Sequence, residues 1–464
     1  ARLATPLKPL MDNLYLDSFF FAVPYRLVWD NWEKFNGAQD DPGDSTDFTI
    51  PIMGTITPTA LSIHDYFGIP VGVSVAGCSS LWHRAYFRIW NEWFRDQNIQ
   101  PSHNLGELTG DGPDTITAGQ TLRPRNKRHD YFTSCLPWPQ KGDSVSLPLG
   151  TAAPVASDAS TLTAVGVYRP APDDDYVEIQ TLGGVGDPVH MSNTASSLAN
   201  RLYADLSTAT AATINQLRQA FQTQKLLERD ARGGTRYTEV IKSHFGVTSP
   251  DARLQRTEYL GGGSTPILVS AVPQTSATDA AVTPQGNLAA YATAAISQHG
   301  FTKSFTEHCL LIGLVSVRAD LTYQQGLDRM FSRSTRFDFY WPALAHIGEQ
   351  AVLSKEIFMS GVAGPADDDS VFGYQERYAE YRYKPSKITG QFRSNHATTL
   401  DIWHLSQEFG SRPTLDTTFI PETPPIDRVV AVPTEPDFLF DSFFRLTCAR
   451  PMPVFGVPGL IDHF

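Results

Sequence analysis

The chain has 464 residues, of which 41% are hydrophobic and 11% aromatic, and its formal net charge is −12. This composition supplies apolar material for a large core and excludes disorder along the whole length. The acidic balance excludes a protein that coats nucleic acid with its entire surface, so any nucleic-acid contact must be local. The 33 Pro and 34 Gly are spread along the sequence, which favours many short strands joined by structured loops.

Four cysteines, Cys78, Cys135, Cys309 and Cys448, lie far apart and form no CxxC pair. A chain of this length does not depend on disulfide bonds for its stability, so we expect free and mostly buried thiols. No uncharged apolar run reaches the roughly 18 residues that a membrane span requires. We therefore expect a protein that is made in a cytoplasm and does not insert into membranes.

The N-terminal part of the chain predicts one strand and one helix. Residues 14–29 are aromatic and β-branched with a central proline, which indicates a half-buried strand that passes into a turn. Residues 81–96 predict a helix, with Ser79 or Ser80 available as its N-cap. Its apolar stripe consists of Trp82, Tyr86, Ile89 and Trp93.

The middle of the chain contains two bland segments around a helix. Residues 151–200 are rich in Ala, Thr, Ser, Gly and Asp, with Arg169 as the single basic residue, which indicates an inserted surface loop. A helix is predicted from about 208 to 232, where Ile214, Leu217 and Phe221 share a face and Gly233 and Gly234 provide the stop. Residues 271–300 have no Lys or Arg and are predicted to be a second loop or insertion.

The C-terminal half predicts further strands. Residues 310–323 are strongly apolar before they begin to alternate, as expected of a strand buried between two layers. Residues 438–453 alternate in a similar way. Strands with long connections, and no βαβ rhythm or internal repeat, indicate a mainly β fold.

An enzyme would need a catalytic constellation, and the sequence shows none of the common ones. Gly72 to Ala76 comes near a GxSxG nucleophile elbow, but alanine replaces the second glycine. The glycine groups at 183–186 and 261–263 lack the strand and helix that flank a phosphate-binding loop, so we interpret them as turns. The twelve His residues form no zinc-type grouping. We expect no catalytic site and no cofactor.

Two acidic runs leave metal binding open. Residues 173–175 and 367–369 offer clustered carboxylate oxygens, which are the ligands that calcium prefers. The spaced ligand pattern of an EF-hand is absent, so solvated loop charge is the favoured interpretation.

Two segments are candidates for nucleic-acid contact. The densest basic cluster could neutralise several phosphates and consists of Arg123, Arg125, Lys127 and Arg128. A second segment interleaves tyrosines with arginines and could stack on bases; its members are Tyr374, Arg377, Tyr378, Tyr381 and Arg382. Packing at subunit interfaces, which are enriched in Tyr and Arg, explains both segments equally well.

Long strings of sequence resemble one known family, the major capsid proteins of Microviridae, and are closest to its gokushovirus-like branch. The first four strings are MDNLYLDSFFFAVPYRLVWDNWEKFNG (11–37), RIWNEWFRDQN (88–98), KRHDYFTSCLPWPQKGD (127–143) and GGTRYTEVIKSHFGVTSPDARLQRTEYLGG (233–262). The others are LTYQQGLDRMFSRSTRFDFYWPALAHIGEQAV (321–352), FGYQERYAEYRYKPSKITGQFR (372–393) and VFGVPGLIDHF (454–464). The resemblance spans nearly the whole chain and thins in the two bland segments.

The resemblance implies a fold and a set of partners. It implies a single eight-stranded antiparallel jelly-roll domain over residues 1–464, with long loop insertions and a few helices. Copies would tile the simplest (T=1) icosahedral shell around circular single-stranded DNA, together with a small basic DNA-binding virion protein and a DNA pilot protein. The insertion at 151–200 would gather at threefold axes as a protrusion that contacts a host surface receptor. Family members also carry an early strand before the point that matches Ala1.

The sequence therefore predicts a structural, self-assembling subunit of a virion, assembled in the host cytoplasm. The alternative that we retain is a jelly-roll carbohydrate-binding module or glycan-active enzyme, because this fold also serves lectins and cupins. A cupin-like His/Glu metal set or a paired-carboxylate cleft would favour that alternative, and the sequence shows neither.

Overall fold

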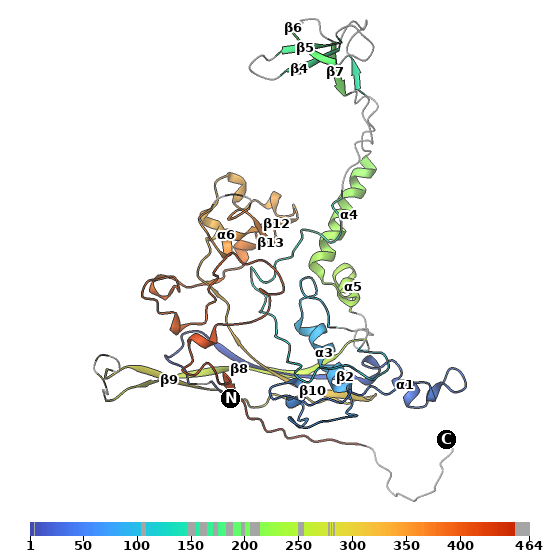
Figure 1. Cartoon of the computed structure of the whole chain (residues 1–464), viewed down its shortest axis with the longest axis vertical. Coiled ribbons are helices and arrows are strands. Elements are labelled where there is room, and N and C mark those ends of the chain that lie inside the picture. Colours follow the sequence, from blue (N-terminus) through green and yellow to red (C-terminus); the bar gives the residue numbers. More distant parts are fainter. Residues whose placement is uncertain are drawn as a thin grey trace, which may run out of the picture. The chain divides into compact units, whose positions relative to one another are not determined.

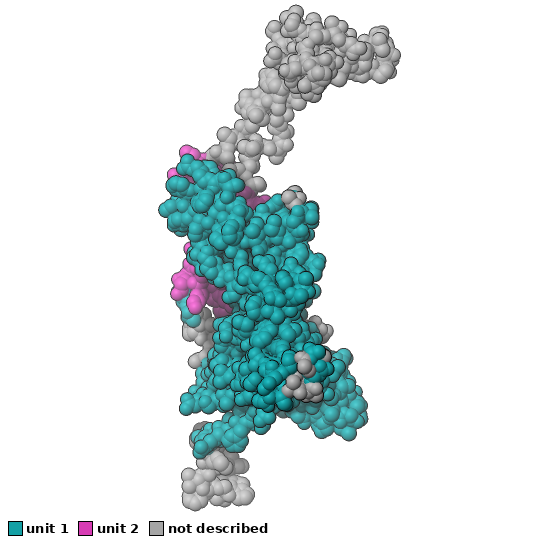
Figure 2. Space-filling model, turned by 90° about the vertical axis from the view of Figure 1, so that its left-hand side faces the viewer, with its two compact units in different colours: residues 1–138, 247–464 teal, residues 139–246 magenta. Residues whose placement is uncertain are grey.

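In the computed structural model the chain divides into two compact units, one of Ala1–Trp138 with Val247–Phe464 and one of Pro139–Gly246 (Figure 2). Side chains and backbone are described for residues 1–3, 5–44, 46–103, 108–145, 214–248, 255–276, 279, 281, 284–362, 364 and 366–450, and the backbone alone for residue 45. Between 155 and 204 the structure describes the backbone of five strands. Each unit is described by itself.

The first unit is built on a six-stranded antiparallel sheet (Figure 1). Its strands in spatial order are β10 (Cys309–Ala319), β2 (Leu14–Pro24), β8 (Glu258–Pro273), β9 (Leu288–Thr293), β1 (Arg2–Leu3) and β15 (Phe438–Leu439). The aromatic and β-branched sequence of β2 suits its place between two long neighbours. The strand predicted at 14–29 is confirmed as far as Pro24, where a turn of 3-10 helix follows.

Two hydrophobic cores lie on opposite faces of this sheet, at opposite ends of β2. Side chains alternate between the faces of a strand, so Phe21 and Val23 point to one side while Leu14 and Leu16 point to the other. The first core holds Phe21, Val23, Val28, Trp29, Ile63, Leu81, Ala85, Tyr86, Phe87, Ile89, Leu108, Leu310 and Ile312. The second holds Leu3, Leu10, Leu14, Leu16, Ile267, Ala292, Ala294, Ala319, Leu405, Val429 and Val430. Each large apolar side chain buried in this way contributes about 1.5–3 kcal/mol.

The strand predicted at 310–323 is confirmed as β10 and the short strand β11 (Thr322–Tyr323). The expectation that it is buried between two layers is wrong. Leu310 and Ile312 are buried, but Leu311 and Val315 on the other face are 44% and 43% exposed. Only one face of this part of the sheet is covered by described residues, because the two cores lie at opposite ends of it.

The helix predicted at 81–96 is confirmed as α3 (Leu81–Ile89), which continues as one turn of π-helix, Trp90–Phe94. The N-cap residue is Ser80, one of the two predicted serines, but its side chain makes no capping hydrogen bond; Ser79 Oγ accepts the backbone N–H of Leu81 at 3.4 Å instead. The prediction that one apolar stripe of this helix packs inward is wrong, because Trp82 and Trp93 are 41% and 40% exposed. The helix packs on β2 and β10 and is covered on other sides by loops, so the polar residues His83 and Arg84 are also buried.

A third core, separate from the sheet, holds the hairpin of β12 (Glu349–Leu353) and β13 (Val371–Glu376). Its buried residues are Tyr131, Phe132, Cys135, Tyr323, Val352, Ile357, Phe372, Ala379, Phe419 and Ile420. Nearby, β11 pairs in parallel with β14 (Ser386–Lys387).

Two expectations for glycine-rich or bland segments are wrong. Gly261 to Gly263, expected as a turn, lie within β8, where a side chain would not fit: a Cβ on Gly262 would meet the backbone oxygen of Ser18 at 2.0 Å. The segment 271–300, expected as a loop, contains the end of β8 and the whole of β9. These two strands pair directly, so the segment is part of the main sheet.

The second unit contains a sheet of its own and two helices. The strands in spatial order are β3 (Val155–Ser157), β7 (Asn200–Ala204), β4 (Val165–Arg169), β5 (Asp175–Thr181) and β6 (Val189–Ala195). The helices are α4 (Ile214–Gly233) and α5 (Tyr237–Phe245). The helix predicted at 208–232 is thus confirmed from Ile214; its first six predicted residues, and the glycine group at 183–186, lie outside the described residues.

The strand predicted at 438–453 is confirmed only as β15, Phe438–Leu439. Residues 440–450 have no regular structure and are exposed, and 451–453 lie outside the described residues. The remaining short helices of the first unit are Trp32–Phe35 (α1), Asp44–Thr46, Ile63–Tyr66 (α2), Arg329–Phe331, Arg336–Asp338, Pro342–Leu344, Ser354–Ile357 (α6), Ala379–Arg382 (α7), Gly390–Phe392, Asp401–Trp403 and Ile426–Arg428. The described chain is therefore mainly β with a few helices, as predicted, while the eight-stranded jelly roll stays a prediction.

Candidate nucleic-acid and assembly surfaces

The basic loop, residues 123–128, presents two of its four cations to solvent. Arg123 and Arg128 are exposed. The guanidinium of Arg123 lies 2.9 Å from Nδ1 of His103 and 5.8 Å from the ring centre of Trp90, so it is held in place with an open edge. Such an anchored guanidinium suits contact with a phosphate or with a carboxylate of a neighbouring protein.

The third cation, Arg125, is used inside the protein. It forms a 2.6 Å ion pair with Asp17, which is 5% exposed, and Arg318 approaches the same carboxylate at 2.9 Å. Burial alone would raise the pKa of Asp17, but hydrogen bonds from Ser264 and Arg125 and the charges of the two guanidinium groups lower it. This ion group joins the basic loop to β2 and β10 and leaves little of Arg125 for a ligand.

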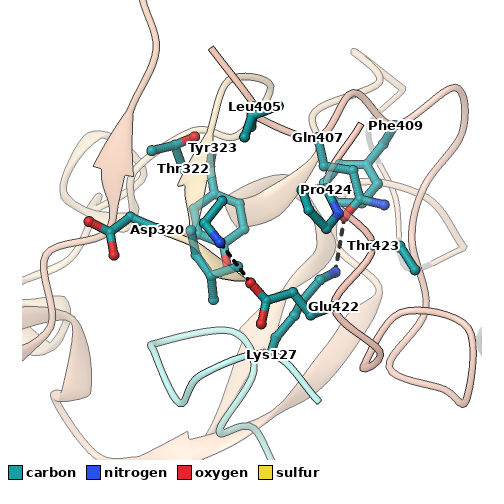
Figure 3. Close-up of a pocket in the computed structure, with 12 residues that line it drawn as sticks. Lys127, Asp320, Thr322, Tyr323, Leu405, Gln407, Phe409, Glu422, Thr423 and Pro424 are labelled. Atoms are coloured by element: carbon teal, nitrogen blue, oxygen red, sulfur yellow. Dashed lines mark hydrogen bonds between the residues drawn. The ribbon is translucent and has the colours of Figure 1, made fainter. Parts of the chain in front are cut away.

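Lys127 is also turned inward, beside a cavity of about 30 Å³ (Figure 3). Its ammonium donates to Oε1 of Gln407 at 3.0 Å and to the backbone oxygen of Phe419 at 2.6 Å, and it lies 4.1 Å from the ring centre of Phe419. Burial lowers the pKa of Lys127 to about 8, against the opposing charges of Asp130 and Glu422. The cavity has the volume of one water molecule, so it is not a ligand site.

The tyrosine-arginine segment, residues 374–382, also divides into inner and outer members. Tyr378 is 4% exposed, and its hydroxyl donates to the backbone oxygen of Phe339 at 3.1 Å. Arg377 lies 4.7 Å over the ring of Tyr378 and donates to the backbone oxygen of Phe337. Tyr374 lies in β13, where its backbone pairs with Leu136. These three residues hold the segment to its surroundings.

The outer members are Tyr381 and Arg382. Tyr381 is 40% exposed, and the guanidinium of Arg333 lies 4.2 Å from its ring centre. Arg382 forms an ion pair with Glu376 in which both side chains are largely exposed. Exposed ion pairs contribute little to stability, so Arg382 remains available to a partner.

Sequence reasoning missed the surface beside this segment, which we call the aromatic loop (residues 330–341). Its exposed apolar residues are Met330 (51%), Phe331 (69%), Phe337 (57%), Phe339 (51%), Tyr340 (53%) and Trp341 (43%). Arg336 lies 5.4 Å from the ring centre of Phe337 and 5.2 Å from that of Trp341. A patch of exposed aromatic residues with arginines is typical of a protein interface. The run FDFYW was the signal in the sequence.

A cavity of about 200 Å³ opens between the aromatic loop and the tyrosine-arginine segment. Its lining combines aromatic and basic side chains with three carboxylates: Tyr131, Phe132, Tyr323, Tyr381, Tyr383, Arg329, Arg333, Lys384, Lys387, Arg393, Asp328, Glu356 and Glu380. Several of the charges pair with each other, as Lys387 does with Asp328 at 2.7 Å and Arg329 with Glu356 at 3.1 Å. Aromatic and basic side chains of this kind suit the binding of a nucleotide base and its phosphate, and they equally suit packing against a neighbouring protein.

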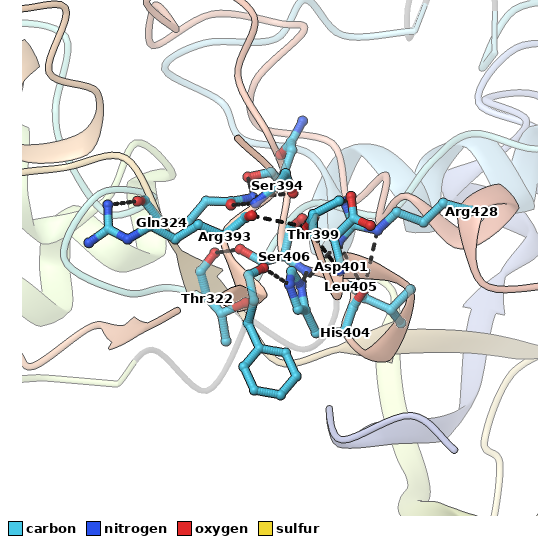
Figure 4. A network of polar contacts seen from close by, with 12 residues as sticks. Thr322, Gln324, Arg393, Ser394, Thr399, Asp401, His404, Leu405, Ser406 and Arg428 are labelled. Carbon is cyan, nitrogen blue, oxygen red and sulfur yellow. Dashed lines mark hydrogen bonds and ion pairs between the residues drawn. The ribbon is translucent and has the colours of Figure 1, made fainter. Parts of the chain in front are cut away.

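A polar network that includes two residues of the cavity lining, Gln324 and Arg393, is structural (Figure 4). Nε2 of His404 donates to the backbone oxygen of Phe392 at 2.6 Å, so Nδ1 accepts from the backbone N–H of Ser406 and from Arg428 at 3.1 Å each. Arg393 donates to the backbone oxygen of Gln324. The network holds together loops that contain little regular secondary structure. Their backbone groups have no partner strand, so side chains supply the hydrogen bonds.

Among the described residues, no group of three His, Cys, Asp or Glu side chains has the arrangement of a metal site. Asp368 accepts from the backbone N–H groups of Ser360 and Gly361, and Asp369 pairs with Lys355 at 2.6 Å, so the second acidic run stabilises its own turn. The first run, 173–175, has no described side chains. Nor is any described helix long and apolar enough to cross a membrane.

All four cysteines are free thiols; Cys135 is buried, Cys78 and Cys309 are partly buried and Cys448 is exposed. Free thiols are confirmed, but the expectation that most of them are buried is wrong, because only Cys135 is buried.

Comparison with known proteins gives a consistent result. A family model described as "Capsid protein (F protein)" matches residues 1–460. Capsid protein VP1 of Bdellovibrio phage phiMH2K is 50% identical, over 100% of this chain and 88% of that protein. Capsid protein VP1 of Chlamydia phage 1 is 42% identical over 99% and 89%, and that of Spiroplasma virus 4 is 38% identical over 99% and 88%. The resemblance found in the sequence is thereby confirmed: the chain belongs to the phage capsid protein (F protein) family of Microviridae and is a structural capsid protein.

Proposed function

We propose that copies of this chain close into a T=1 icosahedral shell, built on an eight-stranded jelly roll, around a circular single-stranded DNA genome. The observation that carries the proposal is the aromatic loop, whose large apolar side chains are 43–69% exposed in the single chain. A monomer that left such a patch uncovered would aggregate, whereas neighbouring copies in a shell would cover it. Several modest contacts around each subunit then add up to a stable particle.

The acidic net charge of the subunit opposes binding of the DNA genome. At −12 the subunit repels DNA as a whole, so packaging relies on local cations and on a small basic virion protein, with a pilot protein as a further partner. Assembly takes place in the host cytoplasm. The subunit has no catalytic role in this account.

Within the basic loop, DNA contact falls to Arg123 and Arg128, because Arg125 and Lys127 already have internal partners. Replacing Arg123 and Arg128 with Gln should lower DNA retention in assembled particles. The slope of log affinity against log salt should fall by about 1.4, which is about 0.7 for each phosphate that the loop no longer neutralises.

The control for this experiment is the same charge change on α4, at Arg218 and Lys225, which are also exposed. Equal loss of DNA in both variants would show a general charge effect. Normal DNA retention with failed assembly in the first variant would assign the basic loop to a subunit interface.

We further propose that residues 151–200 form the host-facing protrusion at threefold axes. The supporting observation is that strands β3 to β7 pair only with one another among the described strands, so their sheet forms a module of its own. A deletion of 151–204 that removes this sheet should leave particle assembly intact and reduce adsorption to host cells. Normal adsorption of deleted particles would contradict the proposal.

A further inference from the structure

The C-terminal arm, residues 440–450, is an extended segment with few contacts to its own subunit. Every residue in it is exposed, and no backbone hydrogen bond joins it to the described residues. Its apolar side chains include Phe443, 90% exposed, and Leu446, 77% exposed. Among the described residues its ring contact joins Phe444 to Phe20, with 6.3 Å between ring centres, and Phe444 still remains 58% exposed.

The sequence of the arm has the partial alternation of a strand with one mainly apolar face. Phe440, Phe444 and Leu446 would share one face with Ser442, and Asp441, Arg445 and Thr447 would share the other with Phe443. Alternation of this kind is stable only when a neighbouring strand satisfies the backbone groups. The arm therefore has the composition of a strand but no described strand beside it.

The complementary feature is the free edge of β10. This strand is the last in its sheet and pairs only with β2 among the described strands. It has 11 residues, and Leu311 and Val315 are exposed on one of its faces. A long, apolar, unpaired edge is a template for a strand from another chain.

Within its own subunit, the described part of the arm could pair with this edge over only a few residues. It begins at β15, on the opposite side of the sheet, and five strand spacings of about 4.8 Å separate the two edges. Crossing about 24 Å at roughly 3.3 Å per residue uses about seven of the residues 440–450 and leaves about four of them to pair, whereas the edge of a neighbouring copy could pair with all of them. The contact of Phe444 with Phe20 agrees, because by residue 444 the arm has reached only β2.

We propose that the C-terminal arm of one copy adds as a strand to the β10 edge of a neighbouring copy. The face with Phe440, Phe444 and Leu446 would then extend the exposed apolar face of Leu311 and Val315. Leaving its own subunit costs the arm one partly exposed ring contact. This inference rests on the proposed assembly into a shell and names one of the contacts that hold it together.

The test uses full-length chains in assembled particles and a short bifunctional thiol reagent. Cys448 lies on the arm and is exposed, whereas burial, with Glu307 and Glu258 nearby, raises the pKa of Cys309 to about 11. In a Cys309→Ser background, Leu311→Cys or Val315→Cys should yield cross-linked dimers and longer chains on a denaturing gel. The same variants with Cys448→Ser should not. Links confined to single chains, or no links in either variant, would overturn the proposal.

A second measurement compares two neighbouring residues on opposite faces of the arm. Leu446→Asp should weaken association by about tenfold or more, because one apolar side chain loses its burial. Thr447→Asp carries the same charge change on the opposite face and should have little effect. Equal effects would overturn the strand geometry. Failure of the unmodified chain to form particles would instead refute the proposed function.

Discussion

Arg84 and His83 show how single polar residues organise the interior of this subunit. Arg84 is fully buried, yet it forms two bonds of 2.6 and 2.7 Å to the carboxylate of Asp114 and donates to two backbone carbonyls. Ser80 donates to the same carboxylate. A buried guanidinium is tolerated only with such complete pairing, so the loop that carries Asp114 is fixed against α3.

His83 lies one residue away and is held neutral. Nε2 of His64 donates to the backbone oxygen of Thr117 at 3.0 Å, so its Nδ1 accepts from Nε2 of His83, also at 3.0 Å. Nδ1 of His83 is then an unprotonated, buried atom with no hydrogen-bond partner among the described residues. Burial, with His64 beside it and Asp114 opposing, lowers the pKa of His83 to about 4.

This geometry predicts a loss of stability in acid. The unfolded chain takes up a proton at His83 near its ordinary pKa of 6.5, and the folded chain only near 4. Between these values the unfolded state binds more protons, so the free energy of unfolding falls as pH falls, by about 3 kcal/mol in total. His83→Gln keeps the hydrogen bond to His64 without a titrating group and should remove this contribution.

The measurement is urea unfolding of the subunit between pH 7 and pH 4. The matched control is His129→Gln, at an exposed histidine, which should keep the pH dependence of the unmodified chain. An unchanged pH dependence in His83→Gln would contradict the assignment.

At the scale of elements, the local sequence pattern predicted the position and type of a helix or strand, because these depend on residues that are close in the sequence. The aromatic run of β2 and the spacing in α3 were sufficient to place a strand and a helix. Which faces are buried was not predictable, because the loops that cover α3 come from distant parts of the chain. The prediction of a strand at 438–453 was mostly wrong for the same reason. The sequence alternates in part, but no described strand of the same subunit pairs with residues 440–450.

The glycines of β8 show a further limit of local pattern. Three consecutive glycines indicate a turn by composition, yet here they allow β2 and the loop at Gly300 to approach the strand closely. Likewise, the basic loop was visible in the sequence, but the internal use of Arg125 and Lys127 depends on partners that lie far away in the chain, such as Asp17 and Gln407.

Gly262→Ala should therefore destabilise the sheet. The added methyl would meet the oxygen of Ser18 at 2.0 Å, and backbone atoms must shift to relieve it, at a cost of about 1–3 kcal/mol. Gly54→Ala, which adds the same methyl where nothing lies within 4 Å, should be close to neutral. Thermal unfolding of both variants measures the difference, and equal melting temperatures would show that the strand does not pack as described.

At the scale of the whole molecule, the subunit is built to be completed by others. Its two main cores lie on opposite faces of one sheet, and each core covers only part of its face. Apolar side chains on the rest of each face stay exposed. They are Leu311 and Val315 on one face, and Leu268 and Tyr291 (66% and 54% exposed) on the other. The aromatic loop and the C-terminal arm add to this surface. A capsid subunit that neighbours enclose on several sides accounts for all of these features.

The central claim is tested most directly by electron microscopy of the purified full-length chain at moderate salt. The account predicts closed particles of uniform diameter with icosahedral symmetry, in which the aromatic loop is buried between copies. Monomers or irregular aggregates under the same conditions, or closed particles with the aromatic loop facing solvent, would contradict it.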